Sequence, residues 1–163
     1  MKIVLLAATL ALCASPALAD QWRYEGGKTP IAWFDNGDAQ FQFACRGGAL
    51  AMGFWVRKPD ASLANANAIS VAIAPDTASG SAIARSGNVS FAQDMPLVHL
   101  DGSSVVVRGP VARQWARIAQ NAMDNMQVAF VRSTASGVEA IDANAFGAKG
   151  SKSTIARVLG ECG

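Results

Sequence analysis

Three cysteines, Cys13, Cys45 and Cys162, carry most of the information about how this chain folds. Cys13 lies in an N-terminal segment that we expect to be removed, so two thiols remain, more than a hundred residues apart. They form no Cys-x-x-Cys redox motif, and with a single histidine in the chain they make a poor zinc site. We therefore predict a structural Cys45–Cys162 disulfide, which fastens a C-terminal end that would otherwise fray.

Residues 1–19 have the pattern of a secretory signal peptide. Lys2 precedes an apolar run from Ile3 to Ala14, and the small-residue site Ala17-Leu18-Ala19 predicts cleavage before Asp20. The run is too short to span a bilayer, which takes about 20 residues. The alanine-rich, lysine-poor composition suggests a bacterium, so we expect a periplasmic or secreted protein.

The remaining residues, 20–163, are expected to form a single β-rich domain. The chain carries 14 basic and 12 acidic residues, with no block of like charge and no basic tail. Nucleic acid and anionic membranes are therefore poor candidates for a partner. No segment after the signal peptide is long and apolar enough for an integral membrane span.

A β-hairpin is predicted around the turn Gly47-Gly48. In the two segments that flank this turn, every second residue is apolar: Phe41, Phe43, Cys45, Leu50, Met52, Phe54 and Val56. Alternation with a period of two is typical of a strand with one buried face. The alternation places Cys45 on the inward face of the first strand, with Gln40 and Gln42 on the other face.

Further strands are predicted at 68–75, 81–93, 96–109, 126–133 and 138–146. Their expected turns are Ser86-Gly87-Asn88, Asp101-Gly102 and Ser136-Gly137. Residues 58–68 form the longest predicted loop.

Two segments have helical spacing instead. The segment 110–123 begins with Pro110, which suits a first helical position, and places Val111, Trp115, Ile118 and Ala122 on one side. The segment after Gly150 has Ser151 as its expected N-cap and a stripe formed by Ile155, Val158, Leu159 and Cys162. We therefore predict a mainly β (α+β) fold: an antiparallel β-sandwich or barrel-like sheet with two short covering helices, the C-terminal one tethered by the disulfide.

Residues with catalytic potential are few. His99 lies close in sequence to Asp101, Ser103 and Ser104, but groups so near along a strand and turn do not readily form a triad, and no nucleophile-elbow motif is present. His99 is interpreted as a residue that flanks a turn. The stretch Asp35–Ala39 lacks the length and ligand order of a calcium loop. We predict no catalytic residue, no metal site, no cofactor and no enzymatic activity.

Four residues are candidates for contact with a ligand or partner: Arg113, Arg117, Ser79 and Gly80. Arg113 and Arg117 lie four apart on one helix, where they could hold a carboxylate or phosphate or simply face solvent. Trp22, Trp33 and Trp55 are expected in the core or in sheet packing, with stacking on a ligand as the alternative.

The order of these features resembles two groups of small secreted proteobacterial proteins. An early tryptophan, the strand "FQFAC", the return strand "MGFWV" and the closing "FGAKGSKSTIARVLGEC" are similar to the invasion-associated locus B type and to periplasmic accessory proteins of type VI secretion systems. Phe146, Gly150, Ile155, Leu159 and Cys162 match the closing pattern, although Lys149-Gly150-Ser151 stands where the first group favours glycine followed by an aromatic. The resemblance implies a non-catalytic accessory protein, secretion- or virulence-associated, whose partner is another envelope protein.

A second resemblance implies a different function. The segment "FACRGGALAMGF" is similar to the opening of periplasmic inhibitors of C-type lysozyme, which are small β-barrels with a disulfide from this strand to the C-terminus. The stretch "TASGSAIARSG", which contains Ser79 and Gly80, loosely matches their inhibitory loop. This chain is longer than such inhibitors and has an inserted helix. Lysozyme inhibition is therefore the alternative function.

Overall fold

A computed structural model describes residues 20–75, 83 and 88–162 of the chain. The strands are β1 (Arg23–Glu25), β2 (Ile31–Asp35), β3 (Ala39–Arg46), β4 (Ala49–Val56), β5 (Ala68–Pro75), β6 (Ser90–Pro96), β7 (Val98–His99), β8 (Ser103–Arg108), β9 (Asn125–Thr134) and β10 (Gly137–Gly147). The helices are η1 (Ala61–Leu63), a 3₁₀ turn, α1 (Pro110–Asn121) and α2 (Ser151–Glu161).

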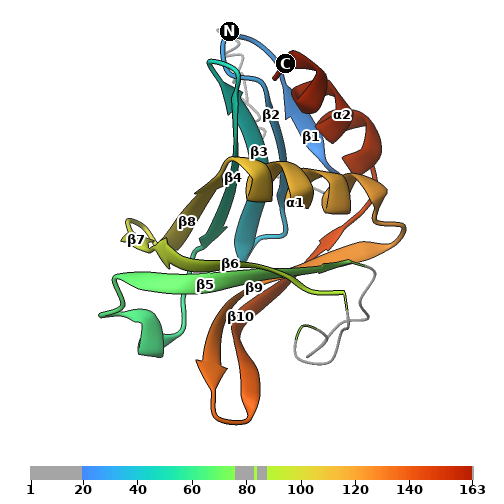
Figure 1. The fold of residues 1–163 in the computed structure, drawn as a ribbon. Coiled ribbons are helices and arrows are strands. Elements are labelled where there is room, and N and C mark those ends of the chain that lie inside the picture. Colours follow the sequence, from blue (N-terminus) through green and yellow to red (C-terminus); the bar gives the residue numbers. More distant parts are fainter. Residues whose placement is uncertain (1–19, 76–82, 84–87, 163) are drawn as a thin grey trace, which may run out of the picture.

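The strands form two antiparallel sheets, which confirms the predicted fold class (Figure 1). A six-stranded sheet has the order β1-β2-β3-β4-β8-β7, and a four-stranded sheet has the order β10-β9-β5-β6. The helix α1 packs against β4 and β8, while α2 packs against β1, β2 and β3, and the two helices contact each other. Both helices therefore cover one face of the six-stranded sheet.

The predicted hairpin is β3 and β4, paired from Ala39 opposite Val56 to Arg46 opposite Ala49, with Cys45 opposite Leu50. Gly47 and Gly48 make the turn with φ of 59° and 77°, the left-handed values that two-residue hairpin turns need and that glycine adopts without strain. The turn at Asp101-Gly102 is likewise present between β7 and β8. The predicted turn at Ser86-Gly87 lies outside the described residues.

One aromatic core joins the two sheets and the helices. Phe54 of β4 meets Phe130 of β9 with ring centroids 5.0 Å apart, and Phe41 of β3 meets Phe146 of β10 at 5.4 Å. Trp22 is buried against Phe41 and Phe43, and its indole N–H donates to the carbonyl of Gly147. The apolar faces of the two sheets are thus buried against each other and against the helices.

Cys45 and Cys162 form the predicted disulfide, with their Cα atoms 5.5 Å apart and both side chains buried. The bridge ties the end of α2 to β3. Ile155 and Val158 of α2 are buried beside it, whereas Leu159 is half-buried. A disulfide of this kind is consistent with an oxidising extracytoplasmic compartment.

Two details of the helices differ from the prediction. The N-cap residue of α2 is Gly150, which adopts the left-handed conformation. Ser151 is the first helical residue, and its buried hydroxyl has no hydrogen-bond partner among the described residues. In α1 the buried residues are Ala112, Trp115, Ala116 and Ala119 rather than Val111, Ile118 and Ala122, which are half-buried. Small alanine side chains at the contact let α1 lie close to the sheet. Within the described residues, neither helix is long and apolar enough to cross a membrane.

Candidate functional site

The outer face of the six-stranded sheet, which we call the open face, is opposite the face covered by the helices. Alternation along β2, β3, β4 and β8 directs apolar residues inward and a second set of side chains outward. The residues of the open face are half-buried or exposed: Trp33, Asp35, Gln40, Gln42, Gly53, Trp55, Ser104 and Val106. Strand pairing places Asp35 beside Gln40, Gln40 beside Trp55, and Trp55 beside Ser104.

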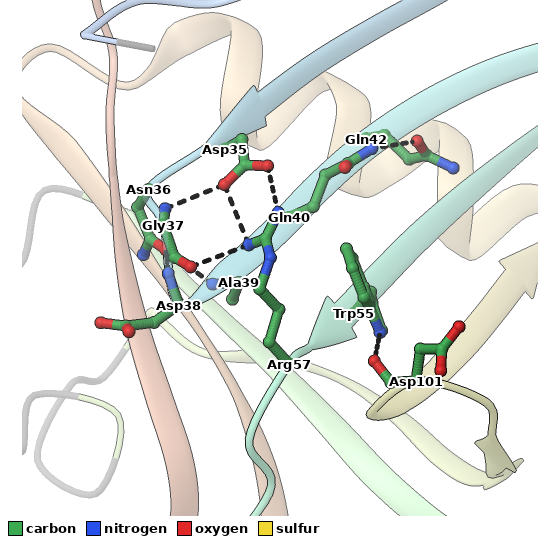
Figure 2. Close-up of polar contacts among 10 residues, drawn as sticks. All are labelled: Asp35, Asn36, Gly37, Asp38, Ala39, Gln40, Gln42, Trp55, Arg57 and Asp101. Carbon is green, nitrogen blue, oxygen red and sulfur yellow. Dashed lines mark hydrogen bonds and ion pairs between the residues drawn. The ribbon is translucent and has the colours of Figure 1, made fainter. Parts of the chain in front are cut away.

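An ion pair lies at one end of the open face (Figure 2). The Arg57 Nη1 atom is 3.0 Å from Asp35 Oδ1 and the Nη2 atom is 2.5 Å from Oδ2, a two-point contact, and Nη1 also donates to the carbonyl of Gly37. The Asp35 carboxylate accepts a further hydrogen bond from the backbone N–H of Gly37. The turn between β2 and β3 is therefore bound to the residue that follows β4.

The surroundings of Asp35 keep it ionised. Partial burial raises the pKa of this carboxyl, but the hydrogen bonds from Arg57 and Gly37 and the Arg57 charge outweigh burial, so the pKa is lowered below its ordinary value of 3.8. The ion pair persists at neutral pH. It presents no net charge to a ligand on the open face.

The same arginine holds the ring of Trp55. The Arg57 guanidinium carbon lies 4.5 Å from the centroid of the Trp55 ring, a cation–π contact. The Trp55 indole N–H donates to the carbonyl of Asp101 at 3.1 Å, in the turn between β7 and β8 (Figure 2). With its ring and its N–H both engaged, Trp55 is a pre-oriented aromatic surface.

Two glutamine amides lie between the tryptophans of the open face. Gln40 Nε2 donates to Gln42 Oε1 at 2.8 Å (Figure 2). Among the described residues, Gln40 Oε1 and Gln42 Nε2 have no further partner, so one amide oxygen and one amide NH2 group remain available. Gly53 leaves room for Gln42, because a Cβ there would lie 3.1 Å from two Gln42 side-chain atoms.

Two adjacent hollows flank the glutamine pair. The Trp55 hollow has a volume of about 320 Å³, and its walls include Gln42, Gly53, Trp55 and the apolar residues Val98, Leu100 and Val106. The Trp33 hollow, of about 290 Å³, includes Trp33, Glu25 and Asp35, and it shares Gln40 and Gln42 with the first. The Trp33 N–H donates to Glu25 at 3.1 Å, and Arg23 lies 5.4 Å from the Trp33 ring centroid.

The structure places the other sequence candidates elsewhere. Arg113 and Arg117 line one groove of about 520 Å³ beside Pro75, so the two side chains do share a surface, on α1 and away from the open face. Ser79 and Gly80 lie outside the described residues.

His99 makes two hydrogen bonds. Its Nε2 atom is 2.9 Å from the carbonyl of Ala66, and its Nδ1 atom is 2.9 Å from the hydroxyl of Ser103. Because a carbonyl only accepts, Nε2 carries the proton. His99 thus ties β7 to β8 and to the loop before β5, in agreement with its interpretation as a turn-flanking residue.

Acidic side chains also meet at the loop that leads into η1. The Asp142 carboxylate accepts the backbone N–H of Asp60 at 2.8 Å. Burial raises the pKa of Asp142 above its ordinary value, and the nearby Asp60 charge adds to this rise. Within the described residues, no group of three or more His, Cys, Asp or Glu side chains is arranged to hold a metal ion.

The Asp35–Arg57 pair and the glutamine pair are not among the residues singled out from the sequence. The register of the β3–β4 hairpin nevertheless indicates which of these residues lie side by side. A turn at Gly47-Gly48 sets Ala39 opposite Val56, which brings the next residue, Arg57, beside the turn that contains Asp35. The same register sets Gln40 opposite Trp55 and Gln42 opposite Gly53.

No protein-family model, no curated protein and no solved structure significantly matches this chain.

Proposed function

We propose that this protein is a non-catalytic binding protein of the bacterial periplasm or extracellular space, and that it holds its ligand or partner on the open face. The single observation that carries this proposal is the pre-oriented Trp55 surface beside unpaired glutamine amide groups. Rigid aromatic groups, with polar groups placed around them, are the usual composition of a binding site. The signal-peptide pattern and the disulfide support the compartment.

The resemblance to secretion- and virulence-associated accessory proteins favours an envelope component as the partner. An accessory role suits a chain whose only histidine is engaged in structural hydrogen bonds. Under this proposal the protein binds and positions, and it converts no substrate.

Site-specific photo-crosslinking in the producing cell tests this proposal. A photoreactive residue at Val106 on the open face should give discrete adducts with an envelope component, while the same residue at the exposed Lys152 on α2 should not. Adducts only from Lys152, or from neither position, would contradict the proposal. A screen with generic ester, peptide and glycoside substrates should detect no turnover, and turnover that His99→Ala abolishes would also contradict it.

Inhibition of C-type lysozyme is the second candidate function. The bridge from β3 to the C-terminal segment agrees with the disulfide plan of the inhibitors that the hairpin sequence resembles. A lysozyme assay in the presence of the mature protein tests it. No inhibition at a large molar excess over several lysozymes would remove this candidate.

A further inference from the structure

We infer that the Trp55 hollow and the adjoining Trp33 hollow bind a chain of N-acetylated amino sugars. This inference rests on the proposed function and names the class of ligand.

The charge of the site favours an uncharged ligand. None of the described residues that line the Trp55 hollow is charged. The nearest pair of opposite charges, Asp35 and Arg57, neutralise each other through their two-point contact. The Trp33 hollow adds one more carboxylate, Glu25, which accepts the Trp33 indole N–H. A phosphate or a carboxylate would lose water in either hollow and find no counter-charge among the lining residues.

The walls require a ligand that is polar and apolar at once. A purely apolar ligand would remove water from Gln40 Oε1 and Gln42 Nε2 without replacing their hydrogen bonds, which is unfavourable. A ligand with hydroxyl groups alone would leave Val98, Leu100 and Val106, which are exposed, without contact. An acetamido group supplies an N–H, a carbonyl and a methyl, so it can satisfy the amides and cover the apolar wall.

The tryptophans supply the remaining contact. One face of a pyranose ring carries C–H bonds of slight positive charge, which pack against the negative face of an indole. Trp33 and Trp55 lie on strands separated by one strand, about 10 Å apart across the sheet, with the glutamine pair between them. Two aromatic surfaces in adjoining hollows match a ligand with repeated rings. An extended peptide instead favours a sheet edge, where main-chain groups are unpaired.

Isothermal titration calorimetry with two tetrasaccharides tests this inference. Tetra-N-acetylchitotetraose, called chitotetraose below, and cellotetraose have the same linkage. They differ in whether C2 carries an acetamido group or a hydroxyl group. We expect saturable binding of chitotetraose with a Kd of about 1 mM or tighter, and at least about tenfold weaker binding of cellotetraose. N-acetylglucosamine alone should bind more weakly than the tetramer, because it occupies one hollow.

Variants locate the binding. Trp55→Ala and Gln42→Leu should each weaken chitotetraose binding by about tenfold, and Gln42 is half-buried on the open face rather than part of the core. The double variant Arg113→Ala/Arg117→Ala, in the separate groove on α1, should bind like the unaltered protein. Co-sedimentation with purified peptidoglycan and with chitin then identifies the source of the sugar chain.

Three results would overturn the inference: no heat with chitotetraose, equal affinity for cellotetraose, or binding unaffected by both open-face variants. If chitotetraose fails while Val106 still crosslinks to an envelope protein, the proposed binding function stands and the ligand class is wrong. If both experiments fail, both proposals are wrong.

Discussion

At Gly102 the backbone brings the β7–β8 turn against the open face. This residue has φ of 124°, and an added Cβ would lie 2.2 Å from the Val56 carbonyl oxygen and 2.7 Å from Trp55 Nε1. We expect Gly102→Ala to cost roughly 2–4 kcal/mol in the free energy of unfolding, because it adds a clash to an unfavourable φ. It should also break the Trp55–Asp101 hydrogen bond, which a shift in tryptophan fluorescence would report.

Gly137→Ala is the matched control for this change. Gly137 has φ of 128°, but an added Cβ would meet nothing within 4 Å. Its cost should be limited to the backbone strain, about 1–2 kcal/mol. Urea unfolding of both variants measures the difference, and equal losses would show that the contact with Trp55 and Val56 has no energetic consequence.

Asp35 gives the fold a dependence on acid. Its pKa is lowered in the folded protein, so the stability it contributes is present above the unfolded value of 3.8 and is lost as pH falls through the folded value. At neutral pH, Asp35→Asn should lower the free energy of unfolding by about 1 kcal/mol, a value suited to a partly exposed pair. The difference from the unaltered protein should vanish in strong acid.

Unfolding in urea between pH 7 and pH 2 measures this dependence. Asp38→Asn, at an exposed position in the same turn, should change stability by less than about 0.5 kcal/mol. If the difference in the free energy of unfolding between Asp35→Asn and the unaltered protein stays constant down to pH 2, the acid dependence does not come from Asp35.

At the scale of single elements, the two ends of α2 depend on the disulfide to different degrees. Its start is held by the buried Ser151 and Ile155 and by the backbone N–H of Trp22, which donates to the Lys149 carbonyl. Its last turn begins with the buried Val158 and is otherwise held by Cys162 and by exposed contacts of Tyr24 with Glu161 and Arg157. A helix of this length is marginal without tertiary contacts, so its two ends should respond differently to loss of the bridge.

Cys162→Ser should lower the free energy of unfolding by roughly 2–5 kcal/mol, the usual loss for a native bridge in a secreted domain. Amide hydrogen exchange should rise first in residues 158–161 and later in 152–155. Cys45→Ser should reproduce the effect, because either change opens the same bridge. An unchanged melting temperature, or equal protection along α2, would show that the terminus is held by other contacts.

The sequence predicts elements best where their pattern is local. The β3–β4 hairpin, the Pro110 helix and the C-terminal helix follow from alternation, turn residues and helical spacing over short windows. The bounds of β1 and β2 cannot be derived from such local patterns, because both strands are short and a glycine-rich stretch separates them. The predicted N-cap of α2, Ser151, is wrong because Gly150 occupies the cap position in a left-handed conformation that suits glycine, close to the Trp22 backbone.

At the scale of the whole molecule, the candidate site depends on which side of the sheet becomes the core. The sequence predicts core or sheet packing for Trp22, Trp33 and Trp55 without distinguishing them, and the structure buries Trp22 but leaves Trp33 and Trp55 half-buried on the open face. Helix placement decides this, because α2 packs on β3 and α1 packs on β4 and β8, both on the side of the sheet that carries the phenylalanines of β3, and the glutamine face stays open. Such long-range packing cannot be derived from alternation alone.

The shared aromatic core predicts that the two sheets unfold together. Phe130 of the four-stranded sheet is fully buried against Phe54 of the six-stranded sheet. Phe130→Ala should lower the free energy of unfolding by about 3–5 kcal/mol, while Phe91→Ala, at a position 39% exposed, should cost less than about 1 kcal/mol.

Two probes should report the same shift. Tryptophan fluorescence reports mainly on the six-stranded sheet and the helices, which hold all four tryptophans or adjoin them, and far-ultraviolet circular dichroism reports on both sheets. Because Phe130 joins the sheets, Phe130→Ala should move both urea midpoints equally within one cooperative transition. Separate midpoints, or faster amide exchange confined to β9 and β10, would mean that each sheet holds its own structure and that the aromatic contact between Phe54 and Phe130 couples them only weakly.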